Sequence, residues 1–277
     1  MHSTLSDGTD TPEELLDSVR EAGIQLFALT DHDAVKGCGM IRDARKAGDP
    51  LFLNGVEFSC RDAEGKYHIL GYGFDPYSAS IRRVVEKGHG IRMKKVEARL
   101  DCIREAFGFT FPEDEIDRLK SLDNPGKPHI GNLMVKYGYA ESMEQAINEY
   151  LDRAKTPSDS LCPQEAIEGI LLAGGIPVLA HPPYGSGNEL IIGGDLERRL
   201  RRLIDLGLRG VEGFYSGFTP KLCAEMLSLA ERYALYITAG SDYHGRNKFI
   251  APGQTRYDDT GPMPEGMKRF LEDVSYG

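Results

Sequence analysis

The fold is decided by the stretch Ile24-Gln25-Leu26-Phe27-Ala28-Leu29-Thr30-Asp31-His32-Asp33. Its first seven residues form a nearly continuous apolar run, which is typical of a parallel strand buried on both faces. Three ionisable side chains follow this run directly. Because β/α folds carry their active sites at the carboxyl ends of parallel strands, the stretch predicts a buried sheet with a functional site at one edge.

The segment before this strand predicts a helix. Thr11 suits the N-cap, Pro12 the first helical position, and Glu14 the position that completes a capping box. Apolar side chains then recur at helical spacing until Gly23, a residue type that commonly ends helices. The sequence therefore opens a β/α alternation with a capped helix leading into a buried strand.

The alternation continues and is interrupted once. Further strands are predicted at 51–58, 67–72, 176–180, 211–214 and 236–239, and further helices at 40–47, 196–206 and 220–234. The charged middle of the chain has a helical pattern and few strand-like runs. We therefore expect an α/β fold, a parallel barrel built from 1–75 and 160–277, with a helical insertion at 76–159.

Composition and charge limit the classes of function. The 277 residues are 40% hydrophobic and 27% charged, as in an ordinary globular protein, and the net charge is −10. An acidic chain of this kind is not expected to bind duplex nucleic acid tightly, although a local basic pocket could hold a small phosphate ester. No apolar run has transmembrane length, and no signal peptide is recognised. The five scattered cysteines, with no CxxC pair, predict reduced thiols in a cytoplasmic protein.

Imidazole and carboxylate side chains gather at the predicted strand ends. The candidate ligands are His2, Asp7, His32, Glu57, His68, His181, Asp242 and His244. A single histidine is most often structural, which is how we interpret His89 between two glycines. The joint pattern instead predicts a metal site, and eight ligands suggest two or three divalent ions of manganese, iron or zinc. Such multinuclear sites support phosphoryl displacement, and no GxSxG or GxxxxGK[ST] motif is present.

Six short motifs resemble those of the PHP (polymerase and histidinol phosphatase) family. They lie at 1–8, 29–33, 55–59, 68–72, 180–182 and 240–244, in the family's order and over most of the chain. The resemblance implies a distorted (β/α)7 barrel with a trinuclear metal centre. The helical insertion resembles the subgroup of small metal-dependent phosphoesterases that act on nucleotides and sugar phosphates.

The resemblance also distributes the ligands. It implies one metal at His2, Glu57 and Asp242, a second at Asp7, His32 and His244, and a third at Glu57, His68 and His181. The family motif is His-x-His preceded by a short strand. This sequence begins at Met1, which corresponds to the residue between the two histidines. We expect the first strand and histidine to be missing, through a misassigned start or a truncation, and a degenerate site is the alternative.

The insertion supplies candidate groups for binding a phosphate. Arg92, Lys127 and His129 are predicted to contact substrate, together with Tyr184 in the loop after His181. Lys94 and Lys95 are interpreted as part of a solvated basic helix face.

The predicted function is hydrolysis of a small phosphate ester by metal-activated hydroxide. The substrate would be a nucleotide, a nucleoside bisphosphate or a cyclic sugar phosphate. The predicted catalytic residues are Asp7, His32, Glu57, Asp242 and His244. Histidinol-phosphate phosphatase and oligonucleotide exonuclease are the enzymatic alternatives, and a degenerate metal-binding module is the non-enzymatic one.

Overall fold

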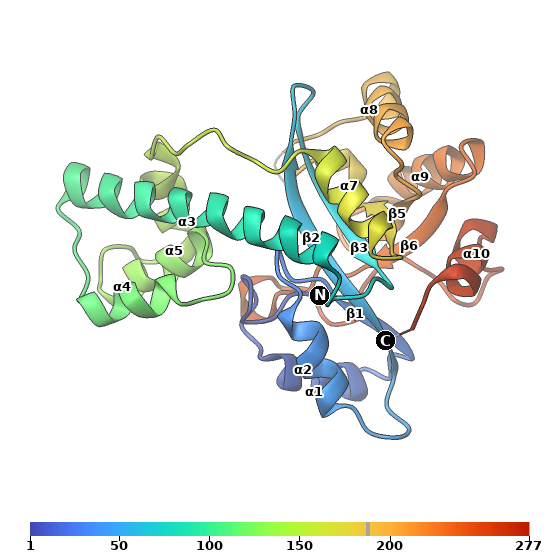
Figure 1. Ribbon diagram of the computed structural model, residues 1–277, viewed down its shortest axis with the longest axis horizontal. Coiled ribbons are helices and arrows are strands. Elements are labelled where there is room, and N and C mark those ends of the chain that lie inside the picture. Colours follow the sequence, from blue (N-terminus) through green and yellow to red (C-terminus); the bar gives the residue numbers. More distant parts are fainter. Residues whose placement is uncertain (187–188, 277) are drawn as a thin grey trace.

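A single curled sheet forms the centre of the computed structural model, which describes residues 1–186 and 189–276 (Figure 1). Its strands follow one another in chain order across the sheet. They are β1 (Leu26–Leu29), β2 (Leu51–Arg61), β3 (Lys66–Tyr72), β4 (Ile176–Leu179), β5 (Gly210–Tyr215) and β6 (Tyr236–Gly240). The α/β class is therefore confirmed, with the six strands arranged as a half-barrel.

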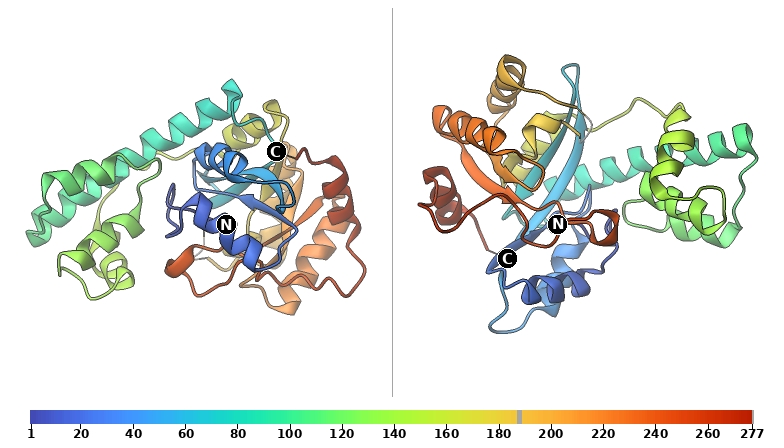
Figure 2. Two further views of the ribbon diagram at one scale, coloured as in Figure 1. Left: turned by 90° about the horizontal axis from the view of Figure 1, so that it is seen from below. Right: turned by 180° about the vertical axis from the view of Figure 1, so that it is seen from behind.

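Helices cover the outside of this sheet and extend beyond one side of it (Figures 1 and 2). They are α1 (Pro12–Glu21), α2 (Lys36–Ala44), α3 (Ala79–Phe107), α4 (Glu113–Lys120), α5 (Lys127–Lys136), α6 (Met143–Gln145), α7 (Pro163–Leu172), α8 (Gly193–Asp205), α9 (Pro220–Arg232) and α10 (Glu265–Asp273). The capping box predicted for α1 is present, because Thr11 and Glu14 each accept a hydrogen bond from the other's backbone N–H. Helix α2 starts earlier than predicted, and neither α7 nor α10 was predicted.

The prediction of a wholly parallel sheet was wrong for β3. This strand runs antiparallel to β2 and to β4, while the other neighbouring pairs are parallel. A tight turn joins β2 to β3, and the Asp62 side chain accepts hydrogen bonds from the backbone N–H groups of Glu64 and Gly65 there. Because parallel neighbours need a crossover of about a dozen residues or more, so short a connection imposes the antiparallel direction.

The direction of β3 decides where His68 lies. His68 stands near the start of β3 and pairs in register with Ser59, near the end of β2. The first half of an antiparallel strand meets the carboxyl ends of its parallel neighbours. His68 therefore reaches the same edge as the predicted strand-end residues, although no strand ends at His68.

Residues 79–153, which we call the helical segment, form no strand and have a core of their own. That core comprises Val96, Ile103, Leu119, Ile130, Met134, Ala146 and Leu151. Helix α3 connects it to the sheet by packing against α7, where Ser80 donates a hydrogen bond to the Gly169 carbonyl. A Cβ at Gly169 would lie 2.6 Å from a Val84 methyl, so this close helix contact requires glycine.

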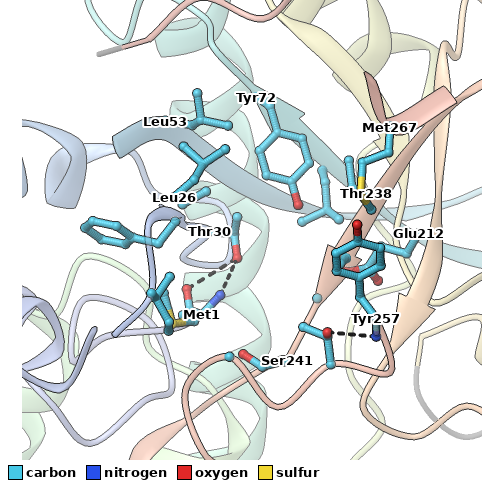
Figure 3. A pocket seen from close by; sticks show the side chains of 18 of the residues that line it. Met1, Leu26, Thr30, Leu53, Tyr72, Glu212, Thr238, Ser241, Tyr257 and Met267 are labelled. Carbon is cyan, nitrogen blue, oxygen red and sulfur yellow. Dashed lines mark hydrogen bonds between the residues drawn. The ribbon is translucent and has the colours of Figure 1, made fainter. Parts of the chain in front are cut away.

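The sheet is open between β1 and β6. A cavity of about 840 Å³ lies between these strands and is lined by Leu26, Thr238 and Met267, among others (Figure 3). The first residues of the chain bridge one end of the gap. Thr30, after β1, donates to the Met1 carbonyl at 2.8 Å, and the His2 N–H donates to the Tyr243 carbonyl, after β6, at 2.8 Å.

No helix among the described residues is both long and apolar enough to cross a membrane.

Candidate metal centre

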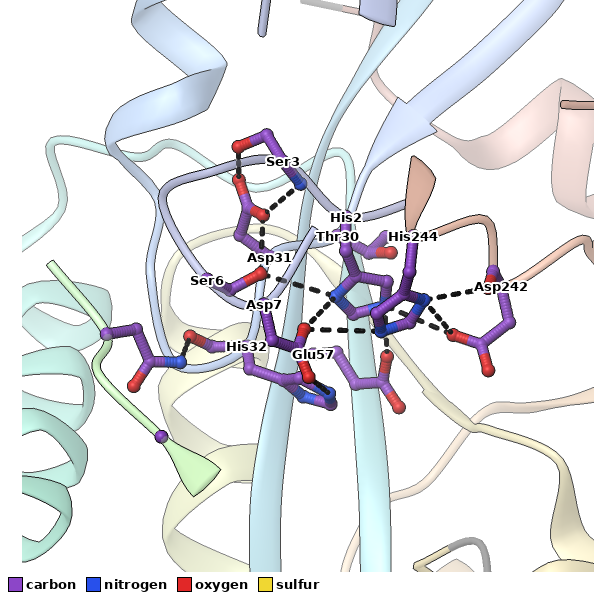
Figure 4. Close-up of polar contacts among 12 residues, drawn as sticks. His2, Ser3, Ser6, Asp7, Thr30, Asp31, His32, Glu57, Asp242 and His244 are labelled. Atoms are coloured by element: carbon purple, nitrogen blue, oxygen red, sulfur yellow. Dashed lines mark hydrogen bonds and ion pairs between the residues drawn. The ribbon is translucent and has the colours of Figure 1, made fainter. Parts of the chain in front are cut away.

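The structure brings all eight predicted ligands together at one edge of the sheet. Figure 4 shows the group around His2, with Asp7, His32, Glu57, Asp242 and His244. The eight ligands arrive on separate parts of the chain. His2 and Asp7 come from the N-terminal loop, His32 from the segment after β1, Glu57 and His68 from the β2–β3 hairpin, His181 from the segment after β4, and Asp242 and His244 from the segment after β6. The convergence predicted from strand ends is thus present in the fold.

Glu57 lies at the centre of the group and is 3% exposed. Its Oε2 lies 3.0 Å from His2 Nε2, and its Oε1 lies 2.6 Å from His68 Nδ1 and 3.2 Å from His181 Nε2. Three imidazoles therefore surround one buried carboxylate, whose two oxygens face different imidazoles.

Asp7 and Asp242 surround His2 and His244 from the other side. Asp7 Oδ1 lies 3.2 Å from His244 Nε2, and Asp7 Oδ2 lies 4.0 Å from His32 Nε2. Asp242 Oδ1 lies 3.3 Å from His2 Nε2. The His2 and His244 rings stack with their centroids 4.1 Å apart, so nitrogen and oxygen donors crowd into a small volume.

These donors form three overlapping sets whose ligand atoms lie within 4.8 Å of one another. The sets are His2, Asp7, His32 and His244; His32, Glu57 and His68; and His2, Glu57 and Asp242. Buried imidazole nitrogens and carboxylate oxygens at these distances are the donor set that divalent cations take in proteins.

Attraction between carboxylates and imidazoles, together with burial, sets the protonation of the ligands. Burial by itself raises the pKa of Glu57, but the surrounding histidines outweigh it and hold that pKa well below its usual value. Burial likewise opposes protonation of His2, yet hydrogen bonds to Asp242 and Glu57 raise its pKa to about 9. Burial lowers the pKa of His32 well below its usual value, which keeps that imidazole neutral and able to bind a metal.

Unusual backbone angles fix the turns that carry the ligands. Asp33, His181 and Asp242 have φ values of 50°, 28° and 54°. Non-glycine residues rarely adopt positive φ, and such residues cluster where surrounding structure holds a functional geometry. The three turns therefore aim side chains at the centre at some conformational cost.

The N-terminal loop is held in place by Asp31, which the sequence analysis had not singled out. The Asp31 carboxylate is 1% exposed and accepts hydrogen bonds from Ser3 N (2.6 Å), Ser3 Oγ (2.7 Å) and Ser6 Oγ (2.7 Å). It therefore fixes the loop that carries His2 and Asp7.

Glu212 is a second residue that the sequence analysis missed. Its Oε2 accepts a hydrogen bond from the His181 N–H at 2.7 Å, and burial raises its pKa to about 7. A Cβ at Gly240 would lie 1.9 Å from Glu212 Oε1, so this carboxylate fits only beside glycine. The sequence signal was a lone acid inside the apolar run 211–214.

Asp242 has two further partners. The Tyr215 hydroxyl donates to its Oδ2 at 2.8 Å, and Lys248 Nζ lies 2.5 Å from the same oxygen. Oδ1, which faces His2, is the oxygen left toward the centre.

The side chains of the four predicted substrate-binding residues have partners outside the ligand set, while the Tyr184 backbone N–H donates to the His181 carbonyl at 2.9 Å. Arg92 Nη2 donates to Asp33 Oδ2 at 2.6 Å and to Ser59 Oγ at 3.1 Å. Lys127 forms an ion pair with Asp152, and Tyr184 donates to the Gly217 carbonyl. His129 Nδ1 accepts from the Gly126 N–H at 3.1 Å.

The helical segment also contacts the metal-binding loop directly. Buried Asn124 donates a hydrogen bond to the His32 carbonyl. His89, interpreted above as structural, lies with Nδ1 2.7 Å from the Asp123 carbonyl. The segment therefore packs against the turn that carries one of the ligands.

Known proteins resemble this chain over most of its length. Residues 1–156 match the PHP domain family. A 3′,5′-nucleoside bisphosphate phosphatase of Chromobacterium violaceum is 30% identical over 98% of this chain and 94% of its own. A phosphoribosyl 1,2-cyclic phosphate 1,2-diphosphodiesterase of Eggerthella lenta is 29% identical over 89% of this chain and 93% of its own. A 5′-3′ exoribonuclease of Haemophilus influenzae is 27% identical over 88% of each chain.

A solved structure agrees with these sequence relatives. A Bifidobacterium adolescentis protein, proposed to be a metal-dependent phosphoesterase, superposes with a TM-score of 0.83 and 26% identity, over 98% of this chain and 94% of its own. Matched family, similar structure and converging ligands lead to the same conclusion: this chain belongs to the PHP domain family and is a metal-dependent phosphoesterase.

Proposed function

We propose that the chain hydrolyses small phosphate esters at a centre of two or three divalent ions of manganese, iron or zinc. The observation that carries the proposal is the overlap of the three donor sets, which share His2, His32 and Glu57. A carboxylate could be shared by two neighbouring cations, and the two oxygens of Glu57 face different imidazoles. The use of all eight predicted ligands, His181 included, and the catalytic role of Asp7, His32, Glu57, Asp242 and His244 are parts of the proposal.

The protein residues would hold the cations and orient the phosphate of the substrate. Bound divalent ions supply Lewis acidity toward a phosphoryl oxygen and generate a nucleophile from water near neutral pH. Glu57, Asp7 and Asp242 stay ionised because the neighbouring histidines lower their pKa values despite burial. Arg92 stands beside Asp33, one residue from His32, where a guanidinium could orient a phosphate's outer oxygens.

The proposed substrates are nucleotides, nucleoside bisphosphates and cyclic sugar phosphates. The bisphosphate phosphatase and the cyclic phosphate diesterase among the relatives support this range. The exoribonuclease relative favours a second candidate, removal of nucleotides from a short oligonucleotide. With a net charge of −10, tight binding of duplex nucleic acid is not part of either proposal.

We also propose a seventh strand and a separate lobe. A strand joined to Met1 would enter the cavity between β1 and β6, since Met1 and His2 already bond to the segments after both strands. It would close a (β/α)7 barrel formed by 1–75 and 160–277. Residues 76–159 would form the inserted lobe, whose own apolar core supports that division.

A cytoplasmic location is proposed from the cysteines. All five are free, and Cys38, Cys60 and Cys223 are buried. Free thiols persist where the surroundings are reducing.

Metal removal and reloading test the proposed function. Protein stripped with a chelator should lose hydrolysis of p-nitrophenyl phosphate and of adenosine 3′,5′-bisphosphate, and manganese, iron or zinc should restore it. Elemental analysis of the reloaded protein should find more than one metal per chain. One ion or none, after loading with all three metals, contradicts the multinuclear centre, and histidinol phosphate as the preferred ester contradicts the substrate range.

A further inference from the structure

Two cavities beside the metal centre have several basic side chains in their linings. One has a volume of about 270 Å³ and the other about 420 Å³, and they share Ser59, Lys95, Arg99, Lys127 and Ser160, so they are continuous. Their basic residues are Arg61, Lys66, Arg92, Lys95, Arg99 and Lys127. In a chain of net charge −10, such a concentration of cations needs an explanation.

Only two of these cations are neutralised by a carboxylate in the part of the chain that the structure describes. Arg92 pairs with Asp33, and Lys127 pairs with Asp152. The other four form no ion pair among the described residues. We call them the cation cluster: Arg61, Lys66, Lys95 and Arg99.

Lys95 and Arg99 project from one face of α3, and both are half-buried. The Arg99 Nε is buried without a hydrogen-bond partner. Burial first, and then the charges of Arg92 and Arg99, lower the pKa of Lys95. Partly buried cations that repel one another are unfavourable unless an anion joins them, because burial removes part of their hydration and no carboxylate among the described residues pairs with them.

The cluster is continuous with the metal centre. Arg61 and Lys66 face each other across the β2–β3 hairpin, and His68, two residues after Lys66, lines the same cavity. Residues two apart on a strand point to the same face, so the proposed ligand His68 and the Lys66 side chain open into one space. Arg92 links the two regions through Ser59 and Asp33.

We propose that the cation cluster is a second anion subsite, which binds a phosphate group of the substrate other than the one hydrolysed at the metal centre. This inference rests on the proposed function and deepens it, because it makes compounds with two phosphates the preferred substrates. The second phosphate belongs either to the same small molecule, as in a nucleoside bisphosphate, or to the next nucleotide of a short chain. Both present the same phosphate oxygens to Lys95 and Arg99.

The test compares neighbouring lysines on α3. Lys95 lines both cavities, whereas Lys94 is exposed and lies 3.9 Å from Asp159. Lys95→Met and Arg99→Met should lower kcat/KM for adenosine 3′,5′-bisphosphate by about tenfold or more, mainly through KM, since hydrogen bonds to charged groups are strong. The same variants should change kcat/KM for adenosine 5′-monophosphate by less than about twofold. Lys94→Met should leave both substrates within about twofold of the wild type.

A third substrate, the 5′-phosphorylated diadenylate, distinguishes the two sources of the second phosphate. A matching loss on the dinucleotide places the phosphate of the next nucleotide in the subsite. A loss on the bisphosphate alone assigns the subsite to small molecules. Equal losses on one-phosphate and two-phosphate substrates overturn the inference, and so does a loss in Lys94→Met that equals the loss in Lys95→Met.

Two further measurements keep the inference testable if a helix variant fails to fold. Lys66→Met changes an exposed hairpin residue and should also weaken use of the bisphosphate selectively. Calorimetric titration of the metal-loaded protein with adenosine 3′,5′-bisphosphate should show affinity lost in Lys66→Met and retained in Lys94→Met. If the wild type hydrolysed none of these esters, the proposed function would fail, whereas the titration would still show or refute anion binding at the cluster.

Discussion

The edge of the sheet and the helical segment differ in how each assembles its polar groups. The edge collects acids and imidazoles from five separate parts of the chain, and Glu57, His181 and His244 are 5% exposed or less. The helical segment presents three cations to one cavity from a single helix, at Arg92, Lys95 and Arg99, and leaves them half-buried.

This difference follows from what each group has to bind. A metal ion needs several donors at fixed distances, which the rigid ends of several strands can provide. A phosphate has outer oxygens on several sides, and long flexible cations can approach them from a single helix. The two regions meet where Arg92 pairs with Asp33 and where Asn124 donates to the His32 carbonyl. The comparison predicts that changes at the edge abolish catalysis, while changes in the helical segment alter substrate use.

The largest effects are expected at the edge. Asp242→Asn, Glu57→Gln and His32→Ala should each lower kcat for phosphate esters by about a hundredfold or more, because each removes a donor for the cation that generates the nucleophile. Circular dichroism should show that the variants remain folded, and metal analysis should show lost metal. Normal turnover in all three variants would mean that the centre lies elsewhere.

An intermediate effect is expected where the two regions meet. Arg92→Ala and His129→Ala should lower kcat/KM about tenfold with metal content unchanged, because they remove positioning rather than chemistry. Arg92→Ala should also destabilise the fold by about 1–3 kcal/mol, since Asp33 loses its partner. Steady-state kinetics, metal analysis and thermal melting on the same preparations check this. Loss of metal in His129→Ala would instead place His129 among the ligands.

The smallest effects are expected at residues already engaged with protein partners. Lys127→Ala and Tyr184→Phe should change kcat/KM by about twofold to threefold, because Lys127 pairs with Asp152 and Tyr184 bonds to the Gly217 carbonyl. Kinetics with p-nitrophenyl phosphate measures this. A loss as large as that of Arg92→Ala would show that these side chains leave their present partners to bind substrate.

The sequence predicted the convergence at the edge because most of the ligands follow or lie in a strand-like run, whereas His2 and Asp7 lie at the start of the chain. Thr30 and Ala180, for example, are each followed by an ionisable residue, and the rule for parallel strands places such residues together. The three overlapping donor sets could not be derived in this way, since they depend on side-chain distances. The distribution of ligands among metals came from the family resemblance, which groups Glu57 and His68 with His181, whereas the structural set groups them with His32. That distribution remains a prediction.

The direction of β3 and the cavity-lining face of α3 could not be predicted from the sequence pattern. The turn that reverses β3 is a short polar stretch, and its effect on strand direction follows from loop length rather than from apolar pattern. Lys95 and Lys94 look alike in sequence, yet only Lys95 lines the cavities, because the packing of α3 decides which face is covered. Arg99 was missed for the same reason.

The reversed direction of β3 also gives the length of α3 a role in placing the cations. The chain leaves β3 at the end of the sheet away from the metal centre, so it has to travel back along the sheet to reach that centre. Helix α3 begins this return at Ser80, against α7, and passes Asp33 at Arg92. At 1.5 Å per residue these twelve steps cover about 18 Å, comparable to the length of a strand. One residue gained or lost between Ser80 and Arg92 would turn the cationic face by about 100°, so the helical phase of this short stretch sets the distance and the direction from which phosphate is approached.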